Sequence, residues 1–137
     1  MAVANKIIVD TGPLVGFVDR SDQWHDWAKA QFDRLPSPML TCESVLSEAS
    51  YLLNGQTDQL FEMIDIGALE IAPLFPEHNH RLRNLMHSYA PRMQLADACI
   101  VHLSELHPSA GVLTTDVADF RIYRRNRNEK LPLIVPS

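Results

Sequence analysis

The feature that most constrains the fold is a short apolar run near the start of the chain, residues 6–10 (KIIVD), which ends in an aspartate. A continuous apolar run of this length is typical of a strand buried on both faces of a parallel sheet. Thr11 or Gly12 is expected to cap a turn of helix directly after it, with Pro13 in the first helical position. The run therefore predicts a parallel α/β fold and places Asp10 at the carboxyl end of a buried strand.

The rest of the chain continues this alternation of strands and helices. Helical spacing of apolar residues, with Gly55 and Gly67 as stops, predicts helices at 22–35, 44–54, 57–67, 77–90 and 93–106. Short apolar runs predict strands at 38–41, 68–75, 111–116 and 131–135. We therefore expect a single α/β domain over residues 1–137, with a central parallel sheet of about five strands and helices on both faces.

Composition supports an ordinary globular domain. The chain has 137 residues, of which 46% are hydrophobic and 21% charged. No apolar run is long enough to span a bilayer and no signal peptide is recognisable, so we expect a cytoplasmic protein. Cys42 and Cys99 each lie among apolar neighbours, as small buried hydrophobes do, although the two thiols could also pair with each other.

Residues 10–12 (DTG) also match half of the catalytic dyad of an aspartic protease. Those proteases are all-β proteins whose two aspartates come from matching loops of two lobes or two subunits. This chain is predicted to be mostly helical, and the tripeptide occurs in it once. The sequence therefore argues against a protease.

Four acidic residues stand at positions that favour a shared site. Asp10 and Asp116 end predicted strands, and parallel strands present their carboxyl ends at one crevice. Glu48 and Asp97 lie on apolar faces of predicted helices, where an uncompensated carboxylate costs several kcal/mol. A cluster of four carboxylates repels itself unless hard cations lie inside it, and Mg²⁺ or Mn²⁺ suits such a site.

Each acid also has a simpler interpretation as a cap or turn residue. Asp10 and Asp116 occupy strand-to-helix junctions, which aspartate favours. Asp97 lies about three residues into its helix, where it can cap the first turn. Glu48 is the hardest to explain in this way, since it is expected in the middle of a helix.

The segments IIVDTGPLV, SVLSEASYLL, QLADACIVHLSEL and GVLTTDVADF together resemble the PIN-domain family, and specifically its VapC-type toxin branch. The resemblance runs from about residue 6 to residue 135. It implies that Asp10, Glu48, Asp97 and Asp116 are the catalytic metal ligands, supported by Thr11, Thr114 and Asp119. Gly12 departs from the family pattern, in which many members carry a second small hydroxyl residue.

The resemblance implies an endoribonuclease that uses Mg²⁺ or Mn²⁺, is held inactive by a cognate antitoxin protein and forms a homodimer. A net charge of −5 argues against general electrostatic binding of nucleic acid. Five of the twelve basic residues, however, lie between positions 121 and 130. Arg121, Arg124 and Arg125 in this stretch are predicted to bind the RNA backbone, although the stretch could equally be a solvated loop.

Three other functions are compatible with parts of this sequence. A phosphoaspartyl phosphatase needs a second aspartate where Gly12 stands, and a receiver domain needs a lysine at a strand end that the chain lacks. A catalytically silent PIN-fold binding module remains the alternative, and metal-dependent cleavage distinguishes it from an enzyme. The letters HNH at 78–80 are expected to open a helix and to face solvent.

Overall fold

A central sheet of five parallel strands organises the molecule, for which a computed structural model describes residues 5–137. Its strands lie in the order β3-β2-β1-β4-β7, and each neighbouring pair is parallel. The strands are β1 (Ile7–Val9), β2 (Met39–Cys42), β3 (Leu69–Ala72), β4 (Gly111–Leu113) and β7 (Leu133–Ile134). The prediction of a parallel α/β sheet of about five strands is confirmed.

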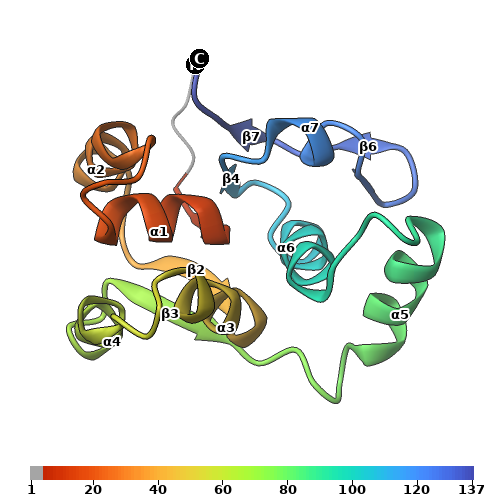
Figure 1. Ribbon diagram of the computed structural model, residues 1–137. Helices are drawn as coiled ribbons and strands as arrows, with labels where there is room; N and C mark the ends of the chain where they lie inside the picture. Colours follow the sequence, from red (N-terminus) through yellow and green to blue (C-terminus); the bar gives the residue numbers. More distant parts are fainter. Residues whose placement is uncertain (1–4) are drawn as a thin grey trace.

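Helices cover both faces of this sheet. They are α1 (Thr11–Val18), α2 (His25–Arg34), α3 (Glu43–Leu52), α4 (Asp58–Asp65), α5 (Asn79–Ser88), α6 (Leu95–Leu106) and α7 (Val117–Phe120). In Figure 1, α1, α2 and α4 lie on one side of the sheet, whereas α6 lies on the other side with α5 outside it. Within residues 5–137, none of these helices is long and apolar enough to cross a membrane.

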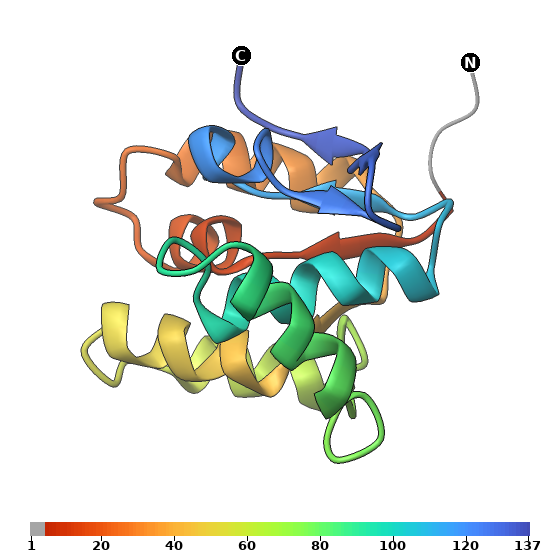
Figure 2. The same cartoon turned by 90° about the vertical axis from the view of Figure 1, so that its right-hand side faces the viewer.

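Burial explains why β1 and α6 occupy the centre. All three residues of β1 are completely buried, which agrees with its unbroken apolar sequence. Helix α6 is buried over most of its length and packs against β1, β2 and β4. Figure 2 shows β1 leading directly into α1, with the turn between α5 and α6 at the same end of the molecule. The carboxyl ends of the strands and the start of α6 therefore share one edge of the fold.

Two segments differ from the sequence-based expectation. The residues after β1 form a full helix that begins at Thr11, so that Asp10 rather than Thr11 or Gly12 is its N-cap residue. The expected loop at 121–130 contains a hairpin of β5 (Arg124–Arg125) and β6 (Glu129–Lys130). Asn126 and Arg127 both adopt positive φ angles in the connecting turn, a conformation that the apolar pattern does not signal.

A polar network fixes α5 against α6. Glu105 accepts hydrogen bonds from Arg81 at 2.6 and 2.9 Å and from the Asn126 backbone N–H at 2.7 Å. One ring nitrogen of His102 lies 2.9 Å from Glu105, and its other ring nitrogen lies 3.0 Å from His78. His78 is therefore half-buried in this network, which corrects the expectation that residues 78–80 all face solvent.

The hydrogen bonds to Glu105 predict how the stability of the protein depends on pH. Burial alone would raise the pKa of Glu105, but the hydrogen bonds from His102, Arg81 and Asn126 lower it from 4.5 to about 2. Because the folded pKa lies below the unfolded value, the stabilisation is full above about pH 4.5 and is lost as the pH falls toward 2.

We expect Glu105→Gln to lower the free energy of unfolding by about 1–3 kcal/mol at neutral pH, because three donors lose a charged acceptor. Urea unfolding at neutral pH and near pH 3 measures the effect, and the difference from wild type should shrink at the lower pH. Glu62→Gln on the exposed side of α4 is the control and should change little at either pH. A pH-independent difference would contradict the assigned role of the Glu105 charge.

Candidate active site

A threonine joins the ends of the two central strands. Asp10 follows β1 and Asp116 follows Thr114 and Thr115 at the end of β4, the neighbouring strand. The Thr114 hydroxyl donates to Asp10 Oδ2 at 2.7 Å and accepts from the Asp116 backbone N–H at 3.0 Å. Thr114 thus holds both aspartates at the same edge of the sheet, as the topology predicts.

Asp10 is not a helix cap in the usual sense. Although it occupies the N-cap position of α1, its side chain makes no capping hydrogen bond and is directed to Thr114 instead. Only 6% of Asp10 is exposed. The pKa of Asp10 is raised from 3.8 to about 7, first by burial and to a smaller extent by the carboxylates of Asp97 and Glu48, although hydrogen bonds from Thr114 and Thr11 lower it.

Asp97 and Asp116 combine a capping contact with a place near Asp10. Asp97 Oδ2 accepts from the Gln94 N–H at 3.4 Å in the capping box that begins α6, and Asp116 Oδ1 accepts from the Asp119 N–H at 3.1 Å. Burial is the main cause that raises the pKa of each carboxyl, and Asp116 also raises the pKa of Asp97. Both carboxylates therefore cap helices and also lie within electrostatic reach of other acids of the group.

Glu48 lies on α3 and faces the same group, but it is exposed rather than buried. This corrects the argument that placed it on the apolar face of its helix. Its pKa is raised first by partial burial and then by Asp97 and Asp116, and is lowered by the nearby Thr11 hydroxyl. The structure therefore brings Glu48 into electrostatic contact with the other three carboxylates.

A tyrosine that the sequence pattern does not reveal positions Asp97. The Tyr123 hydroxyl donates to Asp97 Oδ2 at 2.9 Å, and the tyrosine is completely buried. Its ring packs edge-on against Tyr89 and Phe120, with ring centroids 5.1 and 5.2 Å away. Tyr123 lies 26 residues beyond Asp97 in a stretch that reads as a polar loop, so no local pattern signals its role.

Gly12 allows the first turn of α1 to lie close to Thr115, which follows β4. A Cβ atom at this position would lie 1.9 Å from the Thr115 hydroxyl oxygen and 3.1 Å from Thr115 Cβ. A side chain at residue 12 would therefore displace Thr115. The glycine at position 12 therefore leaves room for the Thr115 side chain.

Asp119 has a different partner from the other acids. Its Oδ1 lies 2.6 Å from Nη1 of Arg92, a residue in the turn between α5 and α6. Arg92 is close enough to lower the pKa of Asp116, against the larger effect of burial. The fold therefore brings a basic side chain next to the acidic residues.

The predicted basic residues have three different environments. Arg121 is exposed, whereas Nη1 of Arg124 donates to the backbone carbonyls of residues 121–123 at 2.7–3.3 Å. Arg125 is buried, donates to Ser104 at 2.8 and 2.9 Å, and pairs with Glu129 at 2.5 Å. The guanidinium of Arg125 is therefore committed to the fold, which corrects its assignment as an RNA-binding residue.

The chemistry of the cluster suits a hard divalent cation. Its donors are carboxylate oxygens, and the buried Thr11 hydroxyl beside them lacks a hydrogen-bond partner of good geometry. Within residues 5–137, however, no three acidic, histidine or cysteine side chains lie close enough together to hold an ion as they are oriented. The donor set fits Mg²⁺ or Mn²⁺, and the side chains would have to turn toward the ion.

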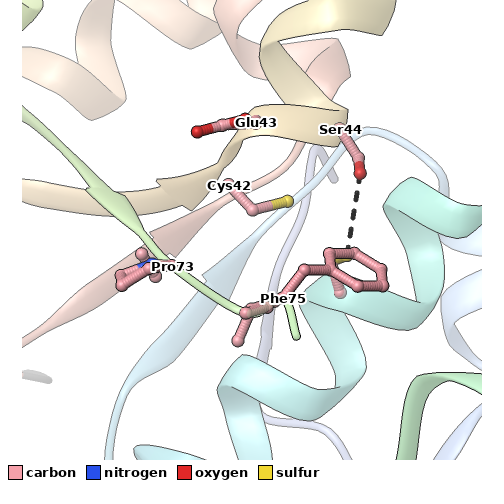
Figure 3. A pocket seen from close by; sticks show the side chains of 8 residues that line it. Cys42, Glu43, Ser44, Pro73 and Phe75 are labelled. Carbon is pink, nitrogen blue, oxygen red and sulfur yellow. Dashed lines mark hydrogen bonds between the residues drawn. The ribbon is translucent and has the colours of Figure 1, made fainter. Parts of the chain in front are cut away.

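A separate small cavity lies beside the ends of β2 and β3. It has a volume of about 110 Å³ and is lined by Cys42, Ser44, Phe75 and Cys99, among others, and Figure 3 shows the first three of these around it. Both cysteines are free, and the Cys99 thiol lies 3.8 Å from the Ser44 hydroxyl. None of the four site carboxylates lines this cavity.

The fold and the crowded carboxylates together define an α/β domain with an acidic site at the carboxyl edge of its sheet. The PIN domain matches residues 7–126, which include the four carboxylates, Thr114 and Tyr123. This chain therefore belongs to the PIN-domain family. PIN domains are typically metal-dependent nucleases. No curated protein matches the chain.

The raised pKa of Asp10 predicts how the metal-free protein responds to pH. Because the folded pKa is about 7 and the ordinary value 3.8, folding favours the protonated acid, and stability is lost as the pH rises between these values. We expect metal-free Asp10→Asn to be at least as stable as wild type near pH 8 and to lack this loss. Thermal melts in chelator from about pH 5 to pH 8 measure it.

Asp33→Asn on the exposed side of α2 is the matched control and should follow the wild-type pH profile. If wild type and Asp10→Asn had parallel profiles of melting temperature against pH, the pKa of Asp10 would not be raised in the folded protein.

Proposed function

We propose that this protein, with a PIN domain that extends over residues 1–137, is a metal-dependent endoribonuclease that hydrolyses phosphodiester bonds of RNA. The observation that carries the proposal is the mutual electrostatic contact of Asp10, Glu48, Asp97 and Asp116, which come from two strand ends and two helices. Such crowding stores repulsion in the free protein, and a divalent cation relieves it.

Asp10, Glu48, Asp97 and Asp116 are the residues that would hold Mg²⁺ or Mn²⁺ in this proposal. The cation, when bound, lowers the pKa of water and neutralises charge on the phosphoryl oxygens. The protein itself keeps the carboxylates oriented at one end of the sheet.

Three side chains support these ligands in the proposal. Thr114 keeps the Asp10 carboxylate directed into the site through their 2.7 Å hydrogen bond. Tyr123 does the same for Asp97 from the core of the protein. Thr11 offers a buried hydroxyl next to Glu48, and this orphaned group can orient a water molecule or a ligand.

A cationic hollow next to α7 supports an RNA path away from the acids. Arg121, Arg124 and Lys130 line a cavity of about 300 Å³, together with the apolar side chains of Phe120 and Leu131, among others. We propose that the RNA backbone passes this hollow, with Arg121 and Lys130 as its exposed contacts. Local clustering of cations explains how an acidic protein of net charge −5 can hold RNA.

We further propose that the protein is the toxin of a cytoplasmic toxin–antitoxin pair and forms a homodimer, as its resemblance to the VapC-type branch implies. An uncontrolled ribonuclease is harmful to its cell, and a protein antitoxin provides the control. Large apolar side chains on α3, on α4 and just beyond α4 are exposed, among them Tyr51, Phe61 and Ile66. Such a surface suits an antitoxin or a second copy of the chain.

The catalytic proposal predicts that RNA cleavage requires Mg²⁺ or Mn²⁺ and is abolished by Asp97→Asn. Asparagine retains an oxygen for the Tyr123 hydroxyl, so the variant should fold while one ligand charge is lost. Cleavage of labelled RNA, with added cation or with excess chelator, measures the effect, and Asp33→Asn should retain wild-type activity. RNA binding without cleavage under every cation condition would favour the silent binding module.

The RNA path predicts that Arg121→Gln and Lys130→Gln each weaken RNA binding and reduce the salt dependence. For single-stranded RNA, the slope of log affinity against log salt should fall by about 0.7 for each phosphate that the protein no longer neutralises. Binding isotherms of the inactive Asp97→Asn protein across a salt series measure this slope. Arg34→Gln on α2 removes the same charge elsewhere and should leave the slope unchanged; an unchanged slope in all variants would contradict the path.

A further inference from the structure

One exposed cation lies at the acidic site itself. Arg92 occupies the turn before α6, the helix that carries Asp97. Its backbone N–H donates to the Tyr89 carbonyl at 2.9 Å, and the next residue, Met93, is buried in the core. Tyr89 in turn packs against Tyr123, which binds Asp97. The backbone of Arg92 is therefore anchored to the same aromatic group that positions Asp97.

The Arg92 side chain is held by a single contact on one side. Its Nη1 lies 2.6 Å from Asp119 Oδ1, and 48% of the side chain is exposed. Among residues 5–137, no other side-chain hydrogen bond involves its guanidinium, so the remaining donors face solvent. A guanidinium with one edge fixed and another free is suited to bind a phosphate through paired hydrogen bonds.

Stability does not explain this ion pair. Pairs between side chains this exposed contribute only about 0–1 kcal/mol. A phosphate that approaches four carboxylates is repelled, however, and a cation at the edge of the cluster offsets that repulsion. Arg125 cannot serve, because it is buried and paired with Glu129, and Arg124 donates to backbone carbonyls.

We propose that Arg92 binds a phosphate of the RNA strand beside the acidic site, and that Asp119 positions its guanidinium for this contact. The proposal rests on the proposed ribonuclease function. It assigns Asp119 to Arg92 rather than to the cation, and it adds a second phosphate contact to the cationic hollow near α7, which Arg92 does not line.

The experiment compares four proteins on a short RNA that the wild type cleaves: wild type, Arg92→Gln, Arg92→Lys and Arg83→Gln. Arg83 is an exposed arginine of α5 and provides the same charge change away from the site. We expect Arg92→Gln to raise KM about 10- to 100-fold, the effect of removing one bidentate interaction, with a smaller change in kcat. Arg92→Lys should recover part of the affinity, and Arg83→Gln should behave as wild type.

Neutral methylphosphonate linkages, placed at one position of the RNA at a time, locate the phosphate that Arg92 binds. In the wild type, one position near the cleavage site should raise KM by the same factor as Arg92→Gln. In Arg92→Gln, that substitution should cause no further increase in KM, because the interaction is already absent. Increases in KM that multiply at every position would overturn the proposal.

Asp119→Asn tests the positioning role. If Asp119 acts through Arg92, its replacement should raise KM in the wild type and have no effect in the Arg92→Gln background. A fall in kcat in both backgrounds would assign Asp119 to the cation and overturn that half of the proposal.

Failure of this inference differs from failure of the proposed function. Wild-type KM in Arg92→Gln, with cleavage still abolished by Asp97→Asn, would overturn the role of Arg92 and leave the ribonuclease intact. Absence of wild-type cleavage with either cation would overturn the proposed function. RNA binding by Asp97→Asn then decides Arg92 separately: a Kd unchanged by Arg92→Gln overturns the phosphate contact, and a 10- to 100-fold increase supports it.

Discussion

The hydrogen bond between Thr114 and Asp10 is the interaction on which the acidic site depends. It joins residues 104 positions apart and closes the gap between the ends of β1 and β4. The same hydroxyl receives the Asp116 N–H, so one atom fixes both strand-end aspartates. A buried carboxyl with a pKa near 7 is unfavourable to fold, and this donor is what makes its burial tolerable.

The side chains around that hydrogen bond become more exposed with distance from Asp10. Asp10 is buried, Asp97 and Asp116 are half-buried, and Glu48 and Arg92 are exposed. The inner residues are oriented by groups of the core, while the outer ones remain free to turn toward a ligand. This gradient combines rigid inner residues with exposed outer residues, an arrangement that suits the proposed binding of both an ion and an RNA strand.

The sequence predicts the fold well because its strongest signals are local. The unbroken apolar run of β1, the glycines that end α3 and α4, and the apolar circumference of α6 each depend on neighbours within a few residues. Contacts made across the fold leave no such pattern. In the sequence, Arg125 resembles the other basic residues of its segment, which are expected to be exposed. Only the fold shows that it is buried, because it donates hydrogen bonds to Ser104 on α6.

The same distinction separates the parts of the candidate site that the sequence predicts from those that it does not. Four acids at strand ends and helix faces can be recognised in the sequence because topology brings such positions together. Tyr123 could not be recognised, since its partner lies 26 residues away and its own surroundings are polar. Arg92 could be named as a basic residue able to extend the cationic surface, but its place could not be predicted, because Asp119 lies 27 residues away. Glu48 was recognised for a reason that does not hold, because it is exposed on its helix.

The order of the strands also determines when the acidic site can exist during synthesis of the protein. Strand β1 is central in the sheet but is made first, and its neighbour β4 leaves the ribosome roughly a hundred residues later. Until then Asp10 has neither Thr114 nor Asp116 beside it, and Asp97 lacks Tyr123. A nascent chain therefore carries the first acids before their arrangement exists, and the acidic site cannot form until β4 and Tyr123 have been synthesised.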